Sequence, residues 1–166
     1  MKLMQQADLL TFLENGLGQL DFDGDLDLGW QKKERTFSID LIFYAQNNDH
    51  QEITDSEGVL SNEEIITFVD SILIYDEQKF DPSMVQQEYL ICLPFAGKQG
   101  WSLAYGQAFL TYLQIILDNG QSDLLDFLNN SEAEIFELEW SKDEFAKILA
   151  AEEKQLQNQR LLYPKF

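Results

Sequence analysis

The stretch WSLAYGQAFLTYLQIILD, residues 101–118, carries apolar side chains on almost every side of a helix. A helix that is apolar all round must be covered over most of its surface. The apolar residues that require this cover are Trp101, Tyr105, Ala108, Phe109, Tyr112, Leu113 and Ile116. The stretch therefore predicts a buried central helix. We expect the Asn119-Gly120 pair to end it and Ser122 to cap a further short helix.

Upstream of this helix, two runs alternate between apolar and polar residues. Leu26, Leu28 and Trp30 alternate in the first run, and residues 37–45 alternate in the second. The charged residues 32–35 lie between the two runs. Alternation with a period of two indicates a strand with one buried face, so the pair predicts a β-hairpin.

Residues 65–75 give a mixed signal. They are rich in Ile, Val, Phe and Thr, which favours a strand. Against this, Ser61-x-x-Glu64 is a capping-box pattern, and the apolar residues that follow it also fit helical spacing. We favour a strand. A short strand is expected around Ile53, and residues 89–95 predict a further strand after the break at Asp81-Pro82.

The two ends of the chain favour helices. Residues 4–17 have helical apolar spacing, and Ser141-x-x-Glu144 predicts the cap of a last helix. Residues 134–140 alternate as a strand would, and the apolar tail, residues 161–166, is expected to dock. Together these patterns predict a single α+β domain over residues 1–166. We expect a mainly antiparallel sheet of about five to six strands, packed by the central helix and by N- and C-terminal helices.

The charge of the chain restricts its partners. Thirty Asp and Glu residues face eleven Lys and Arg residues, for a net charge of −19. Such a surface repels phosphate backbones and anionic lipids, so we expect no direct binding to nucleic acid or membrane. It favours a basic protein as partner, although solubility alone would also explain the charge. The densest carboxylates, and thus the candidate binding residues, are Asp21, Asp23, Asp25, Asp27, Glu137 and Glu139.

The row formed by Glu137 and Glu139 has two interpretations. Like charges on one face of a strand cost stability, and binding a basic partner would explain why they are tolerated. Protection of an edge strand from aggregation explains the row equally well.

The first acidic cluster also invites a calcium hypothesis. Asp23, Asp25, Asp27 and Glu34 occupy positions 1, 3, 5 and 12 of an EF-hand-like loop. The sharp turn of that loop needs glycine at position 6, where this chain has Leu28. The alternation of a strand would also splay the carboxylates apart. We therefore expect no metal site here.

The remaining chemical candidates are weak. His50 is the single histidine and lies in a polar loop, and Cys92 is the single cysteine and lies in an apolar strand. The run Gly97-Lys98-Gln99-Gly100 is not a phosphate-binding P-loop. We assign no catalytic residue and expect no cofactor.

Three segments resemble a known family. They are residues 120–128, the run Glu137-Leu138-Glu139-Trp140 and the ending Tyr163-Pro164. They are similar to a family of small acidic proteins of Firmicutes, chiefly Lactobacillales, described only as a domain of unknown function. The resemblance spans the whole chain and implies a bacterial cytosolic setting.

These observations favour a non-enzymatic protein-binding or regulatory module in the cytoplasm that engages a basic partner. The N-terminus turns polar before an apolar signal core forms, and the longest uncharged stretch, residues 99–117, is too polar and too short to span a bilayer. The alternative is a hydrolase that uses Asp and Glu as general acid and base, with or without a divalent cation. Two carboxylates of shifted pKa in the largest pocket would favour the hydrolase, whereas a flat acidic face with exposed aromatics would favour the binder.

Overall fold

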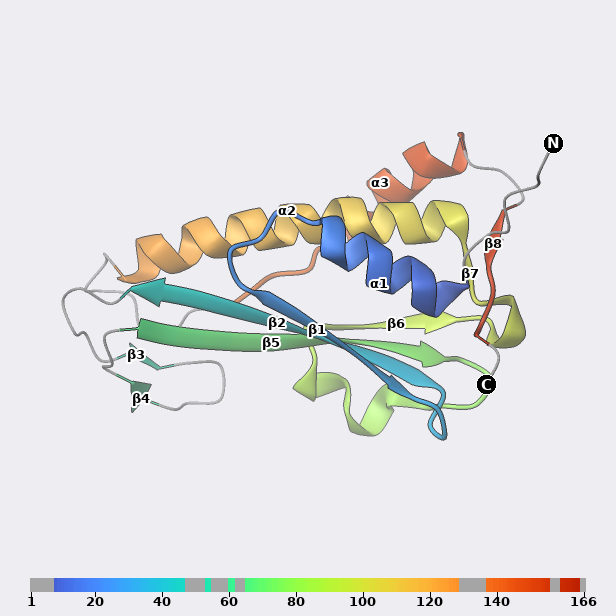
Figure 1. Ribbon diagram of the computed structural model, residues 1–166, viewed down its shortest axis with the longest axis horizontal. Helices are drawn as coiled ribbons and strands as arrows, with labels where there is room; N and C mark the ends of the chain where they lie inside the picture. The colour runs from blue at the N-terminus through green and yellow to red at the C-terminus, as the bar shows by residue number, and fades with distance from the viewer. Residues whose placement is uncertain are drawn as a thin grey trace.

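The computed structural model describes residues 8–46, 53–54, 60–61, 65–128, 137–155 and 159–164. Its centre is a four-stranded sheet with helices on one side (Figure 1). The strand order is β1-β2-β5-β6, formed by Asp25–Gln31, Thr36–Gln46, Ile65–Asp76 and Ile91–Phe95. The pairs β1–β2 and β2–β5 are antiparallel, and β5–β6 is parallel. This confirms the α+β class, the hairpin and the strand at residues 65–75.

The alternation of the sequence decides which side chains face the helices. Every second residue of β2, from Phe37 to Ala45, is buried. Register places Phe37 beside Trp30 of β1 and Ile74 of β5, so apolar residues of neighbouring strands share one face. Burial of this face against the helices forms the core, because it removes the most apolar area from water.

The central helix α2 spans Leu103–Leu128 and lies along the sheet (Figure 1). It begins where the Oγ of Ser102 accepts a hydrogen bond from the Tyr105 backbone N–H at 3.0 Å. Trp101, Phe109 and Tyr112 are buried, as the sequence predicts. The predicted stop at Asn119-Gly120 and the cap at Ser122 are wrong, because the helix continues through both.

Gly120 continues the helix for a packing reason. A Cβ atom at this position would lie 2.6 Å from Leu138 Cδ2 and 2.9 Å from Phe43 Cε2. The glycine therefore allows α2 to approach both the sheet and residues 137–140. The sequence pair Asn-Gly, which resembles a turn, is here a close contact inside a helix.

Two further helices confirm the predictions for the ends of the chain. Helix α1, Leu9–Gln19, is capped by Asp8, whose side chain accepts from the Thr11 N–H. Helix α3, Lys142–Glu153, is capped by Ser141, whose side chain accepts from the Glu144 N–H. The backbone N–H of Ser141 donates to the Tyr112 hydroxyl at 2.9 Å, which anchors the start of α3 to α2.

The sheet differs from the prediction in size and direction. The four strands form a mixed sheet, and the other described strands form two separate two-stranded pairs. These pairs are β3–β4, Ile53–Thr54 with Leu60–Ser61, and β7–β8, Trp101–Ser102 with Arg160–Leu161. Between β5 and β6 the chain makes two short 3-10 turns, η1 at Pro82–Met84 and η2 at Gln86–Glu88. This connection lets β6 run parallel to β5, which alternation alone does not reveal.

The predicted strand at residues 134–140 is wrong for its described part, residues 137–140, which form no regular element. The alternation itself is real, because Glu137 and Glu139 are exposed while Leu138 and Trp140 are partly buried. Trp140 packs edge-on against Tyr112 of α2 with ring centroids 4.7 Å apart. Residues 134–136 lie outside the described residues.

The described part of the C-terminal tail docks into the core, as predicted. Tyr163 is buried and stacks on Phe95, with ring centroids 5.3 Å apart. Its hydroxyl accepts a hydrogen bond from Trp30 Nε1 at 2.8 Å. The tail thereby ties together β1 and β6, the two outer strands of the sheet.

Candidate functional site

Part of the face of the sheet that points away from α2 is acidic. We define the open face as Asp25, Asp27, Asp40, Tyr44, Val69 and Ser71, which alternate with the core residues of β1, β2 and β5. None of the four described strands β1, β2, β5 and β6 contains Lys or Arg. Tyr44 and Val69 are 42% and 48% exposed, so an aromatic ring and an apolar side chain lie among the carboxylates.

Two carboxylates face each other on the open face. Asp27 of β1 lies directly opposite Asp40 of β2. Side chains in this relation have Cβ atoms about 5 Å apart, and like charges at that spacing are destabilising. Ser71 donates a hydrogen bond to Asp40 Oδ1 at 2.7 Å. Asp27 has no hydrogen-bond or ion-pair partner among the residues that the structure describes.

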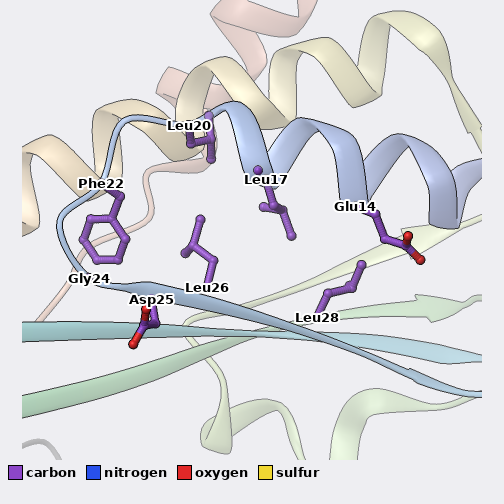
Figure 2. Close-up of a pocket in the computed structure, with 9 residues that line it drawn as sticks. Glu14, Leu17, Leu20, Phe22, Gly24, Asp25, Leu26 and Leu28 are labelled. Atoms are coloured by element: carbon purple, nitrogen blue, oxygen red, sulfur yellow. The ribbon is translucent and has the colours of Figure 1, made fainter.

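Asp25 is held at the same face by an aromatic hydroxyl. The Tyr44 hydroxyl donates to Asp25 Oδ2 at 2.6 Å. This hydrogen bond, then burial and then the negative charges of Asp25 and Asp27, raise the pKa of Tyr44. Figure 2 shows Asp25 projecting away from α1, whereas Leu26 and Leu28 point into the hollow beneath that helix. The hollow has a volume of about 410 Å³ and is lined mainly by apolar residues.

The acidic cluster of the sequence is divided by the fold. Asp21 and Asp23 precede β1 and line a small hollow of about 120 Å³ beside α2. The Asp21 N–H donates to Gln114 Oε1 of α2 at 2.8 Å. Asp25 and Asp27 instead lie on the open face, and the sequence-predicted binding residues therefore form two separate groups.

The calcium hypothesis requires residues that the fold keeps apart. Asp23 lies before β1, Asp25 and Asp27 lie along it, and Glu34 lies in the turn after it. Among the described residues, no three His, Cys, Asp or Glu side chains are arranged to hold a metal ion.

A groove of about 610 Å³ adjoins the open face at the edge of β5. Its floor is Val69, Asp70 and Ser71 of β5. One wall is residues 87–90, at the end of the β5–β6 connection, and the other is Glu137 with Leu138. The groove exists because β6 pairs with β5 only from Ile72 onward, so the first half of β5 has no neighbour on this side in the described sheet.

Asp70 is the unusual residue of the groove. It lies on the helix-facing side of β5, in register with Leu41. Its nearest neighbours on this side of β5 are apolar. Burial raises the pKa of Asp70; the negative charge of Glu137 adds to the increase, and a hydrogen bond from the Ser71 N–H opposes it. Glu88 and Glu137 are exposed in the walls, and none of the lining residues is Lys or Arg.

Sequence reasoning identified Glu137 but missed Asp70, Glu88 and Asp40. A signal for Asp70 existed, because it interrupts the inward series of Ile66, Phe68, Ile72 and Ile74. Glu139 lines a separate hollow of about 240 Å³ against α2, which Glu137 also borders. Because residues 137–140 form no strand, the edge-protection interpretation of the two glutamates loses its basis.

The remaining chemical candidates are not activated in the structure. Cys92 lies on β6, and burial raises the pKa of its thiol, which disfavours the nucleophilic thiolate. Gly97 begins a 3-10 turn that ends at Gln99, and Gly100 follows it; both glycines have positive φ. A Cβ on Gly100 would collide with the Leu161 carbonyl oxygen. This turn packs against the tail. His50 lies outside the described residues.

Comparison with known proteins shows the family. A family model described as "Protein of unknown function (DUF3013)" matches residues 4–165. The chain belongs to the DUF3013 family. A crystal structure of a conserved protein of unknown function from Enterococcus faecalis is similar to the chain, with a TM-score of 0.85 and 35% identity. The match covers 99% of this chain and 100% of that one. This DUF3013 assignment confirms the resemblance noted in the sequence.

No curated protein matches this DUF3013 chain. No helix among the described residues is both long enough and apolar enough to cross a membrane.

Proposed function

We propose that the protein is a non-enzymatic binding module whose open face engages a basic protein. The observation that carries this proposal is the opposition of Asp27 and Asp40 on a surface whose strands have no Lys or Arg. A lysine or arginine of a partner placed between the two carboxylates would convert a repulsion into two attractions.

The other properties of the open face support the same function. Tyr44 and Val69 supply exposed apolar area, and aromatic residues are enriched where protein interfaces are strongest. The net charge of −19 would steer a basic partner toward the protein and would repel nucleic acid.

A direct test uses a fluorescein-labelled, lysine-rich peptide and fluorescence anisotropy at increasing salt. The test variant carries Asp27→Asn with Asp40→Asn, which removes two charges from the open face. The matched control carries Asp123→Asn with Asp126→Asn, which removes two charges from exposed positions of α2. We expect weaker binding for the open-face variant than for the control, and weaker binding of the native protein as salt rises. Equal effects of the two variants, or binding that is insensitive to salt, would remove the proposal.

The partner itself can be sought with the same proteins. The native protein and both double variants serve as baits in a pull-down from the native organism, with elution at graded salt. A basic protein retained by the native bait and the α2 control, and lost by the open-face variant, is the partner that the proposal requires.

A hydrolase is the second candidate, and one observation favours it. Asp70 lies in the groove of about 610 Å³ with its pKa raised, as a general acid requires. We rank it second because Glu88 and Glu137, the other carboxylates of the groove, are exposed to water. Chromogenic ester, phosphate and glycoside substrates would test it. Turnover lost with Asp70→Asn and kept with Asp27→Asn would favour the hydrolase.

A further inference from the structure

The groove lies where a longer β6 would have continued along β5. Strand β5 extends over Ile65–Asp76, whereas β6 covers only its second half. In Figure 1, β6 begins beside the middle of β5, and η1 and η2 lie on the side of the sheet away from α2. The groove therefore lies where the pairing of β5 with β6 has ended, and it has a wall on each side.

The backbone of β5 presents polar groups to this groove that pair with none of the residues that the structure describes. The Ser71 carbonyl accepts a hydrogen bond from the Leu90 N–H at 2.7 Å, so the polar backbone groups of Ser71 point toward the β6 side. Because these groups alternate along a strand, those of Val69 and Thr67 point the same way. No hydrogen bond of the described residues reaches the outward groups of Thr67 or Val69 on this edge. A strand edge whose backbone groups lack partners is a template for pairing with another chain.

The walls determine what kind of strand would fit. Side chains of an added strand would point alternately toward the two faces of the sheet. On the helix side they would meet Asp70, and Glu88 and Glu137 line the walls of the same groove. Leu90 and Leu138 supply apolar contact within the same groove. Thr67 to Ser71 spans roughly 13 Å, enough for about four or five residues of an extended peptide.

We propose that an extended basic segment of the partner binds in this groove by adding a strand to the edge of β5 between Thr67 and Ser71. This inference rests on the proposed function, because it names how the basic partner is held. Main-chain hydrogen bonds to Thr67 and Val69 supply affinity, and lysine or arginine side chains opposite Asp70, Glu88 and Glu137 supply specificity. The groove is continuous with the open face, because the Ser71 hydroxyl in the groove floor donates a hydrogen bond to Asp40. A bound segment would therefore contact both.

A second copy of the same chain fits the groove poorly. Pairing two β5 edges would bring two acidic grooves together, each on a molecule with a net charge of −19. Like charges placed together suppress an interface. The occupant that we expect is therefore a partner of opposite charge.

The test uses three labelled peptides of equal charge. The first alternates lysine with threonine and favours an extended strand. The second has the same sequence with alternate backbone nitrogens methylated, so that it cannot complete a strand ladder. The third combines lysine with alanine and favours a helix. We expect the first peptide to bind about tenfold more tightly than the other two, as the loss of one or two backbone hydrogen bonds implies.

Protein variants locate the contact. Val69→Pro removes an N–H that points sideways, away from β2. The pairing of β5 with β2 is therefore kept, as proline is tolerated on edge strands. Val69→Thr is its control, because it changes the side chain and keeps the N–H. Glu137→Gln should weaken binding, whereas Glu139→Gln, at an exposed position that does not line the groove, should not. Amide hydrogen exchange at Thr67 and Val69 should slow when the first peptide is added.

The outcomes separate this inference from the proposed function. Salt-sensitive binding that is equal for all three peptides and unchanged by Val69→Pro overturns strand addition and leaves the electrostatic binder standing. Failure of every peptide to bind at low salt overturns both. A native dimer that Val69→Pro converts to a monomer would assign the edge to a second copy and overturn the proposed occupant. Because the methylated peptide leaves the protein unchanged, the test holds even if Val69→Pro fails to fold.

Discussion

The Arg35 Nε lies 2.6 Å from Asp76 Oδ2, and this ion pair joins the turn after β1 to the end of β5. Asp76 is 0% exposed, and its second carboxylate oxygen accepts a hydrogen bond from the Gln78 N–H at 2.9 Å. The Arg35 guanidinium also lies 4.1 Å from the centroid of the Tyr163 ring. Arg35 adopts a φ of 57°, a left-handed conformation that costs energy for a residue with a Cβ. The pair therefore links three distant segments of the chain at one point.

Removing one partner of this pair should destabilise the fold strongly. Asp76→Ala would leave the half-buried Arg35 guanidinium without its carboxylate, and loss of one partner of a buried pair costs about 3–5 kcal/mol. Urea unfolding followed by circular dichroism measures the change. The exposed pair Lys147–Glu144 is the control, because Lys147→Gln should alter the free energy of unfolding by no more than about 0.5 kcal/mol. Equal effects of the two substitutions would contradict the structural role of Arg35 and Asp76.

Neutralising one carboxylate of the open face should stabilise the protein. Asp27→Asn removes the repulsion with Asp40 and breaks no hydrogen bond of the described residues, so we expect a gain of about 0.2–1 kcal/mol at low salt. The gain should shrink as salt screens the repulsion. Thermal unfolding with and without salt measures it. Asp126→Asn, on the exposed side of α2, reports the effect of net charge alone, and an equal gain there would show that the Asp27–Asp40 relation has no local cost.

Two glycine substitutions should act in opposite directions. Gly120→Ala places a methyl group against the buried Phe43 ring, and overpacking of about 1–3 kcal/mol outweighs the gain in helix propensity of about 1 kcal/mol. In Gly18→Ala the new Cβ has nothing within 4 Å, so we expect a stabilisation of about 0.5–1 kcal/mol. Chemical denaturation of both variants tests the pair. A stabilised Gly120→Ala protein would mean that α2 does not approach the sheet so closely.

The stability of the protein should depend on the ionisation of Asp70. Because burial raises the pKa of Asp70 in the folded state above its unfolded value, folding favours the protonated carboxyl. Its contribution is therefore most favourable below the unfolded pKa, about 3.9, and is lost as pH rises through the folded pKa. Asp70→Asn keeps an acceptor for the Ser71 N–H and removes the charge, so its melting temperature should exceed that of the native protein at neutral pH. The difference should fall towards zero in acid. A difference that is constant with pH would show that ionisation of Asp70 is not responsible.

Several features were predictable because local patterns decide them. The alternation in residues 26–45 predicted the β1–β2 hairpin and its buried face, since a one-residue shift would turn every apolar side chain outward. Ser141 predicted the start of α3, because a side-chain oxygen that accepts a backbone N–H is a local event. The composition of residues 65–75 likewise predicted β5.

The sites depend on contacts between distant residues, and only the tertiary structure decided them. Nothing in the run from Asp21 to Asp27 shows that Asp27 lies opposite Asp40 while the Asp21 backbone is hydrogen-bonded to Gln114. Nor does the strand pattern of residues 89–95 reveal that β6 is parallel to β5 and covers only half of it.

The sequence by itself thus determined the types of most elements, the faces they bury and the acidic character of the surface. The fold decided which carboxylates come together, how far α2 extends past Gly120 and how much of β5 the strand β6 covers. The physical reason is that hydrogen bonding and burial within one segment constrain that segment alone. The register and direction between segments depend on packing that no single segment contains.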